Sequence, residues 1–145
     1  MAGVSSYPIV RIKTVSKTSG RTNGMLMPLW KDYDSLPAMT PRYVYYATCR
    51  AGEEKGPYLH RKRRTLLNLV EGRIILAYRE AEVFKETEVN ADSHPVLFDI
   101  PAGVGYLIRN PFKDDAVMVN ICDYPWKEGD NETEAPDFSD YKSKF

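Results

Sequence analysis

The sequence predicts an all-β protein with one domain. Its 145 residues are enough to bury a single core without disulfides. The middle of the chain consists of short runs of β-branched and aromatic residues separated by Gly, Pro and Asp, which is typical of β-sandwiches and barrels. No long stretch has the 3.6-residue apolar period of an amphipathic helix. We expect this single domain to cover residues 1–125.

Ten segments have the composition of strands. They are Ile9–Val15, Met25–Leu29, Arg42–Cys49, Tyr58–His60, Thr65–Glu71, Arg73–Arg79, Val83–Val89, Val96–Ile100, Gly105–Asn110 and Ala116–Asp123. Glu71 and Gly72 separate two apolar runs and predict a hairpin turn, because glycine adopts positive φ at little cost. The sequence from Pro101 to Gly103 predicts another turn before the next strand.

The end of the chain differs from the rest in composition. Residues 126–140 are rich in Asp, Glu and Pro and poor in aliphatic side chains. We therefore expect an acidic tail over residues 126–145 that lies on the surface. Phe138, Tyr141 and Phe145 are available to attach this tail to the body of the protein or to a second subunit.

Composition excludes several classes of function. The 20 Lys and Arg residues balance the 20 Asp and Glu residues, which argues against a nucleic-acid-binding protein. The apolar stretches are too short to span a membrane. The first residues lack a secretory signal, so we expect a cytoplasmic protein in which Cys49 and Cys122 are free thiols. The glycosylation pattern at Asn131 is expected to be unused there.

Two glycine- and proline-anchored runs, residues 52–72 and 95–110, resemble the two signature motifs of the cupin superfamily. The resemblance implies a double-stranded β-helix, also called a jelly-roll barrel. At the four positions where metal-binding cupins carry His, His, Glu and His, this chain carries Tyr58, His60, Thr65 and Tyr106. Because a divalent ion needs three or four such ligands, we expect no metal and no other cofactor. Thr65 and Asn110, at motif positions, are predicted to contact a ligand.

The residues around His60 predict a site for proton transfer. Tyr58 and His60 are two residues apart on a predicted strand, so their side chains point the same way. Tyr106 is expected on the facing sheet, and Tyr45 near the same mouth of the barrel. Histidine titrates near neutral pH and phenols donate hydrogen bonds, which suits proton transfer. A core histidine that is satisfied by a neighbour is the common structural alternative.

A basic run over residues 61–64 follows His60. A solvated basic turn is the common interpretation of such a run. Beside a cavity, however, guanidinium groups match phosphate oxygens in paired hydrogen bonds. Arg61, Arg63 and Arg64 are therefore predicted to bind a diphosphate.

A narrower resemblance rests on Pro41–Tyr46, Gly56–Lys62, Ile100–Gly103 and Lys113–Val117. These segments resemble the dTDP-4-keto-6-deoxyhexose 3,4-ketoisomerases and, more distantly, the dTDP-4-dehydrorhamnose 3,5-epimerases. The resemblance implies a metal-free homodimer that moves protons next to the ketone of a nucleotide-linked sugar, with His60 as the base. The chain departs from the ketoisomerases at Tyr58, which replaces their first His, and from the epimerases at Pro57 and Thr65, which replace an Arg and a Lys.

The sequence thus favours an isomerase or epimerase of a dTDP-like 4-keto-6-deoxy sugar, in which Tyr58 and Tyr106 assist His60. Two alternatives remain open. One is a cupin that binds a sugar or another small molecule without turnover. The other is a metal cupin with the unusual ligands Tyr58, His60 and Tyr106.

Overall fold

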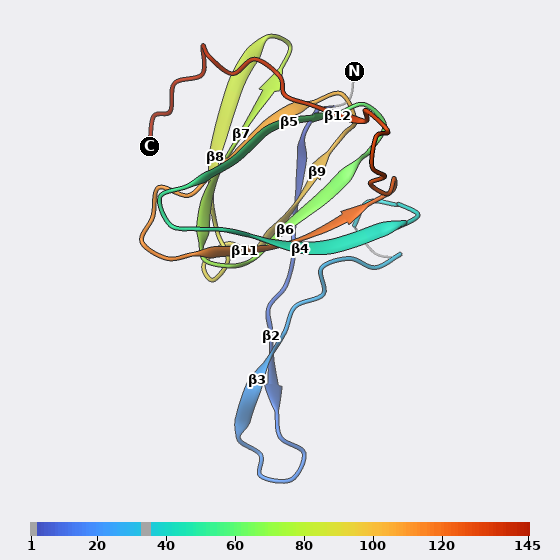
Figure 1. The fold of residues 1–145 in the computed structure, drawn as a ribbon. Coiled ribbons are helices and arrows are strands. Elements are labelled where there is room, and N and C mark those ends of the chain that lie inside the picture. Colours follow the sequence, from blue (N-terminus) through green and yellow to red (C-terminus); the bar gives the residue numbers. More distant parts are fainter. Residues whose placement is uncertain (1–2, 33–35) are drawn as a thin grey trace.

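The computed structural model describes residues 3–32 and 36–145, and in these residues it is all-β (Figure 1). The strands are β1 (Ser5–Pro8), β2 (Ile12–Val15), β3 (Thr22–Leu26), β4 (Tyr43–Cys49), β5 (Glu54–His60), β6 (Thr65–Glu71), β7 (Arg73–Glu80), β8 (Val83–Asn90), β9 (Val96–Ile100), β10 (Gly105–Arg109), β11 (Ala116–Cys122) and β12 (Thr133–Glu134). No helix among the described residues is long and apolar enough to cross a membrane.

Two antiparallel five-stranded sheets face each other and form the barrel. Their strand orders are β1-β9-β6-β11-β4 and β12-β5-β10-β7-β8, and a separate hairpin joins β2 to β3. The predicted all-β cupin jelly roll is therefore confirmed. The chain alternates between the sheets, so that strands distant in sequence, such as β4 and β11, become neighbours.

The predicted strand bounds agree best with the observed ones in segments that are rich in β-branched and aliphatic residues. β6, β9, β10 and β11 lie within one residue of their predicted bounds, whereas β5 starts at Glu54, four residues before its prediction. β1 and β12 were not predicted, because short polar segments become strands only by pairing with β9 and β5. Of the predicted strand Ile9–Val15, only the part from Ile12 onward is a strand, namely β2.

The turn at Gly72 corrects one prediction. β6 pairs with β9 and β11, and β7 pairs with β8 and β10, so residues 71–72 form a corner between the sheets rather than a hairpin. Gly72 has φ +86°, and a Cβ there would lie 2.8 Å from the carbonyl oxygen of Asp115. Glycine is required by both the dihedral angle and the close approach. The predicted turn at Pro101–Gly103 is present, with φ +85° at Gly103.

Side chains from both sheets fill the core. The main cluster includes Leu67, Leu69, Ile74, Leu76, Val89, Phe98, Ile108 and Met118. Burying one such side chain contributes about 1.5–3 kcal/mol, so the cluster holds the sheets together. β6 is buried on both faces over Thr65–Leu69, because the cluster around Leu66 on its outer side is covered by Met27, Leu29, Trp30, Leu36 and Met39. Cys49 and Cys122 are buried free thiols, as predicted.

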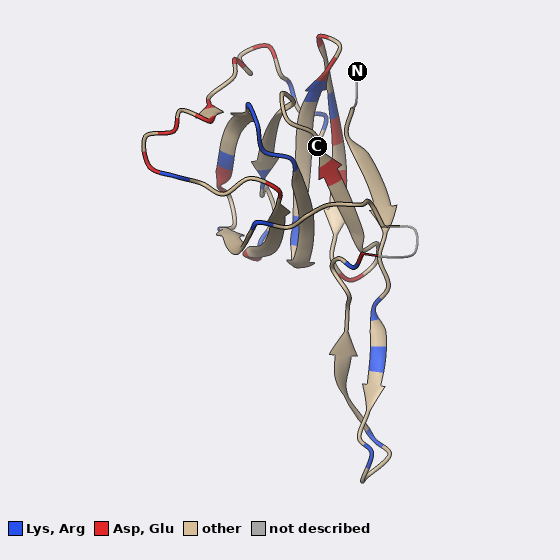
Figure 2. Cartoon of the chain, turned by 90° about the vertical axis from the view of Figure 1, so that its right-hand side faces the viewer, with Lys and Arg blue, Asp and Glu red and all other residues tan. Residues whose placement is uncertain are grey.

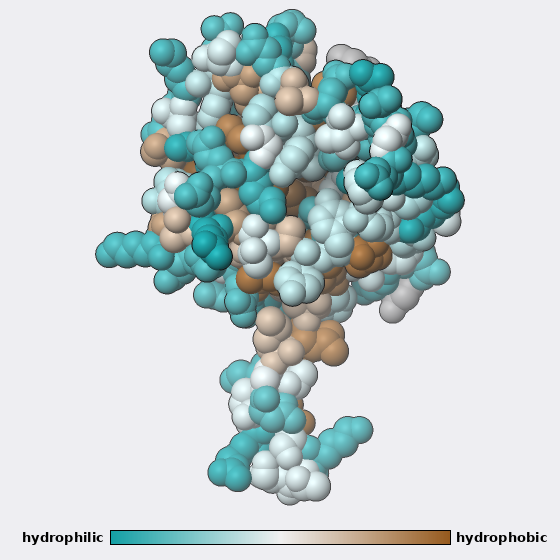
Figure 3. Space-filling model, in the orientation of Figure 1, coloured by the Kyte–Doolittle hydropathy of each residue, from teal (hydrophilic) through white to brown (hydrophobic). Residues whose placement is uncertain are grey.

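The β2–β3 hairpin projects away from the barrel (Figures 1 and 2). Ile12, Val15, Met25 and Leu26 on this hairpin are about half exposed, at 45–52%. Figure 3 shows apolar surface where the hairpin meets the barrel. Because these side chains are half exposed, the hairpin lacks a covering surface within the described part of the chain. An isolated two-stranded hairpin is only marginally stable in water.

The C-terminal tail lies along the second sheet. β12 pairs with β5, with Thr133 opposite His60. Farther on, the ring of Phe138 packs edge-on against Phe84 at 4.9 Å between centroids. The Tyr141 hydroxyl donates a hydrogen bond to Glu86 of β8. These contacts attach the tail to the body of the same chain and carry it past the mouth of the barrel.

Candidate active site

A cavity of about 300 Å³ lies between the two sheets at one end of the barrel. Its wall is built from side chains of four strands, the turn after β5 and the tail, namely Tyr45, Lys55, Tyr58, His60, Arg63, Tyr106, Ile108, Met118, Asn120, Trp126 and Thr133, together with Ala47. The alternation of β5 turns both Tyr58 and His60 inward, as the sequence predicted. Such a cavity is at the small end of the usual range for ligand pockets, about 300–1,000 Å³.

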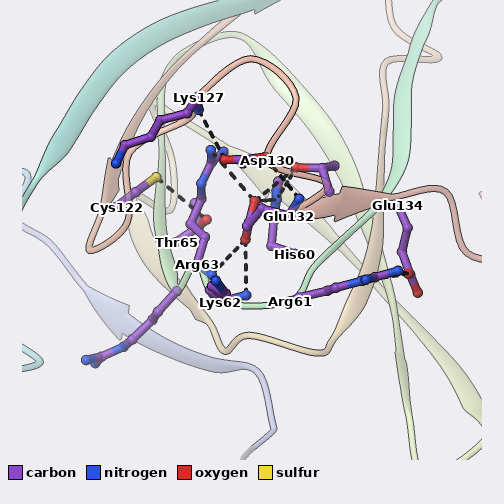
Figure 4. Close-up of polar contacts among 12 residues, drawn as sticks. His60, Arg61, Lys62, Arg63, Thr65, Cys122, Lys127, Asp130, Glu132 and Glu134 are labelled. Atoms are coloured by element: carbon purple, nitrogen blue, oxygen red, sulfur yellow. Dashed lines mark hydrogen bonds and ion pairs between the residues drawn. The ribbon is translucent and has the colours of Figure 1, made fainter.

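His60 is the centre of the polar network in this cavity and is only 6% exposed. Its Nδ1 lies 3.2 Å from Oε2 of Glu132 and 3.0 Å from the Thr133 hydroxyl. Its Nε2 lies 3.2 Å from the hydroxyl of Tyr106. Figure 4 shows Glu132 between His60 and Arg63. Both ring nitrogens of His60 are thus held in place by named partners.

Glu132 belongs to the tail but is 2% exposed. Its Oε1 accepts hydrogen bonds from the backbone N–H groups of Arg63 at 2.8 Å and Lys62 at 3.2 Å. Burial raises the pKa of this carboxyl, but those two backbone donors, with His60 and Thr133, lower the pKa and outweigh burial. Glu132 is therefore ionised at neutral pH, and it is a strong acceptor for His60.

The environment keeps His60 neutral. Burial is the largest cause that lowers its pKa below 6.5, and the positive charge of Arg63 lowers it further, while Glu132 acts in the opposite direction. A neutral imidazole carries one N–H, and the carboxylate of Glu132 holds that proton on Nδ1. The lone pair of Nε2 then faces the Tyr106 hydroxyl and the cavity. This tautomer is the one that can accept a proton from a ligand.

Three tyrosines surround the imidazole. Tyr106 pairs in register with Tyr58 on the neighbouring strand, so the two lie in the same sheet, and the prediction that Tyr106 lies on the facing sheet was wrong. Their ring centroids are 5.6 Å apart. Tyr45 comes from the facing sheet, and its hydroxyl accepts a hydrogen bond from Asn120 at 3.1 Å. Burial raises the pKa of all three phenols, most strongly for Tyr106, so each remains a proton donor.

The predicted arginine cluster is divided by the structure. Arg61 is exposed and pairs with Glu134, with 2.6 Å between Nη2 and Oε2. Arg64 pairs with Asp99 at 2.8 Å and donates to the Ala38 carbonyl. Only Arg63 lines the cavity. Successive residues of this turn point in different directions, so the three guanidinium groups do not form one diphosphate clamp.

Two further predicted contacts have structural partners instead. Thr65 is 1% exposed, and its hydroxyl lies 3.7 Å from Sγ of Cys122. Asn110 follows the end of β10, where its Nδ2 donates to the carbonyl oxygens of Cys49 and Asp114 at 2.9 and 2.8 Å. These residues support the neighbouring strands and do not line the cavity.

Several residues of the site were not predicted from the sequence, among them Asn120, Trp126, Glu132 and Thr133. Asn120 alternates with Met118 on β11, so strand parity was an available signal. The other three belong to a tail whose acidic composition indicated solvent exposure. Within residues 3–32 and 36–145, no group of three or more His, Cys, Asp or Glu side chains could hold a metal ion.

Comparisons with known proteins give one family match and several similar folds. A family model described as FdtA: WxcM-like, C-terminal, matches residues 7–143. A dTDP sugar isomerase from Desulfovibrio desulfuricans superposes with a TM-score of 0.76 at 18% identity, covering 93% of this chain and 84% of that one. No match was found among curated protein sequences.

Two further solved structures are similar. A mutant of the 3,4-ketoisomerase QdtA from Thermoanaerobacterium thermosaccharolyticum, in complex with TDP-4-keto-6-deoxyglucose, has a TM-score of 0.70 at 20% identity, with 92% of this chain and 88% of that one covered. The 3'-monoepimerase ChmJ from Streptomyces bikiniensis, in complex with dTDP-quinovose, has a TM-score of 0.71 at 14% identity, with 92% and 69% covered. At these identities the likeness shows a shared fold.

Proposed function

This chain belongs to the family described as FdtA: WxcM-like, C-terminal, and on that basis we propose that it is an isomerase or epimerase of a dTDP-linked 4-keto-6-deoxy sugar. One observation carries the proposal. His60 is buried, neutral and oriented by Glu132, and its Nε2 lone pair lies 3.2 Å from the Tyr106 hydroxyl inside a cavity. The ligands named for QdtA, TDP and TDP-4-keto-6-deoxyglucose, support the choice of substrate class.

The proposed reaction begins at the carbon next to the ketone. A carbonyl makes the neighbouring C–H acidic, and Nε2 of His60 removes that proton as a general base. The electron pair of the C–H bond forms the double bond of an enolate, and the charge moves to the carbonyl oxygen. Reprotonation at another position, or from the other side, completes an isomerisation or an epimerisation. No metal takes part in this scheme.

Tyrosine hydroxyls are suited to return the proton. Tyr106 lies 3.2 Å from Nε2 of His60, and Tyr58 is its cross-strand neighbour. Both remain protonated because burial raises the pKa of their phenols. We assign Tyr106 as the group that exchanges a proton with His60, and Tyr58 as a second donor at the same wall.

The size of the cavity supports a proposal for where the parts of the substrate lie. A volume of about 300 Å³ suits a hexose ring rather than a whole nucleotide sugar. The sugar would occupy the cavity, and the diphosphate would lie across its mouth. Trp126, which lines the mouth and is 58% exposed, is placed to contact the nucleotide there.

Apolar surface supports a homodimer. Val44 and Tyr46, on the outer face of the edge strand β4, are 59% and 74% exposed, and the β2–β3 hairpin carries further exposed apolar side chains. Contiguous exposed apolar surface and an unpaired edge strand are typical of an interface. The chain has a mass of 16.6 kDa, so light scattering should give twice that value. A monomer at micromolar concentration would contradict this part of the proposal.

Incubation with TDP-4-keto-6-deoxyglucose in D2O tests the activity. An enzyme of this class should introduce deuterium at C3 or C5, and NMR identifies the carbon. Binding of the ligand without exchange, at high protein concentration, would instead favour a cupin that binds sugars without turnover. Neither binding nor exchange would reject the assigned substrate class.

A further inference from the structure

Arg63 is a buried cation whose donors are incompletely used. Its side chain is 5% exposed and lines the same cavity as His60. The guanidinium carbon lies 5.4 Å from the ring centroid of Tyr43. Its Nε and Nη2 atoms are inaccessible to solvent and have no hydrogen-bond partner among the described residues. Buried polar groups are nearly always paired, so these donors require an explanation.

The neighbouring carboxylate does not use them. Nη2 of Arg63 lies 3.9 Å from Oε2 of Glu132, which is beyond hydrogen-bond distance. Glu132 already accepts from two backbone N–H groups, from Thr133 and from His60. Arginine keeps its proton at all physiological pH values, so burial cannot neutralise it. Arg63 therefore places a fixed positive charge at the wall of the cavity, while its unpaired Nε and Nη2 lie behind that wall, out of reach of solvent.

We propose that the positive charge of Arg63 stabilises the ligand oxygen that becomes negatively charged when His60 removes a proton. This assignment rests on the proposed function. When the C–H electron pair moves into the new double bond, the carbonyl oxygen becomes an enolate oxygen, and the positive charge of Arg63 stabilises it. The charge disappears again when the neighbouring carbon is reprotonated. Arg63 would therefore be a catalytic residue that acts most strongly in the transition state.

Two observations favour an enolate oxygen over a diphosphate. Arg63 lies at a cavity that holds little more than one sugar ring, and the carboxylate of Glu132 lies 3.9 Å from its Nη2. A diphosphate placed there would bring its charges next to the carboxylate of Glu132. Arg61 and Arg64, which face outward, already have carboxylate partners. One oxygen that gains charge only during the reaction fits the space and the charge.

The test compares Arg63→Met with Arg61→Met, using TDP-4-keto-6-deoxyglucose in D2O. Methionine keeps much of the aliphatic volume and removes the guanidinium. We expect Arg63→Met to lower kcat for proton exchange by about 10²–10³-fold, the usual effect of losing one group that stabilises an oxyanion. Calorimetric affinity for the same ligand should change much less. Arg61→Met should exchange at nearly the wild-type rate, because Arg61 is exposed and outside the cavity.

Each outcome leads to a decision. An unchanged rate of deuterium exchange in Arg63→Met overturns the assignment. The assignment is also overturned if Arg63→Met binds the free nucleotide TDP more weakly while kcat is unchanged, because that result would identify a diphosphate contact. Absence of exchange in the wild-type protein rejects the proposed function itself. If Arg63→Met fails to fold, Arg63→Gln removes the charge but keeps a polar side chain beside Glu132. A wild-type kcat in Arg63→Gln would then overturn the assignment, and a clear loss in the folded protein supports it.

Discussion

Replacing Glu132 with glutamine should damage both stability and activity. The side chain keeps its shape but loses the charge that accepts from His60 and from the backbone N–H groups of Lys62 and Arg63. It also leaves the buried Arg63 without its only carboxylate neighbour within 4.0 Å among the described residues. Breaking a buried charge pair costs about 3–5 kcal/mol, and the retained amide oxygen places this change near 3 kcal/mol. For a chain of this size, that lowers Tm by roughly 10 °C.

The effect on activity follows from the tautomer of His60. A carboxylate can only accept the Nδ1 proton, whereas an amide can also donate to Nδ1 and so move the proton to Nε2. An imidazole with its proton on Nε2 has no lone pair toward the cavity. The contribution of a general base, about 10²–10⁴-fold in kcat, would be lost in large part.

Thermal unfolding and deuterium exchange into TDP-4-keto-6-deoxyglucose measure the two effects of Glu132→Gln. Glu134→Gln is the matched control, because Glu134 is two residues away in β12 but pairs with the exposed Arg61. An exposed pair contributes little, so this control should unfold and exchange almost as the wild type does. If Glu132→Gln also keeps its Tm and kcat, the role given to the carboxylate is refuted.

Three further predictions concern pH, the tail and one glycine. Burial and Arg63 lower the pKa of His60 below 6.5, so kcat/KM should remain high at pH 6.5 and decline only at lower pH. Arg63→Met should move the midpoint of this pH profile upward. A wild-type midpoint above pH 6.5 would contradict this. Phe138→Ala removes the ring that packs on Phe84, so limited proteolysis should cut the tail faster and exchange should decrease; an unchanged cleavage rate would count against it. Gly56 has φ +102°, and a Cβ there would lie 3.1 Å from the Tyr58 ring. Gly56→Ala should therefore lower the free energy of unfolding by about 1–3 kcal/mol, measured by denaturant titration. A change below about 0.5 kcal/mol would be inconsistent with that packing.

The cupin fold could be predicted because its motifs are local. Each run of about twenty residues carries its own strand pattern and its glycines, and strand parity alone directs Tyr58 and His60 to one side. Strand parity was not sufficient to place Tyr106. It indicated that Tyr106 lies inward but not which sheet carries it, since sheet membership depends on how β10 pairs with β5 and β7.

The partners of His60 could not be predicted from local sequence. Glu132 is 72 residues away in the chain, and only the pairing of β12 with β5 brings it to the imidazole. Its acidic surroundings indicate solvent exposure, because the burial of one carboxylate depends on the backbone donors that it meets. Arg63 has the same composition signal as Arg61 and Arg64, and the path of the turn alone directs it inward.

His60→Gln in D2O with TDP-4-keto-6-deoxyglucose tests the central claim most directly. Glutamine can retain a hydrogen bond to Glu132 but cannot accept a proton from carbon. We predict that the wild-type protein incorporates deuterium next to the ketone and that the folded variant does so at least about 10²-fold more slowly. Equal rates of incorporation in the two proteins would contradict the assignment of His60 as the base.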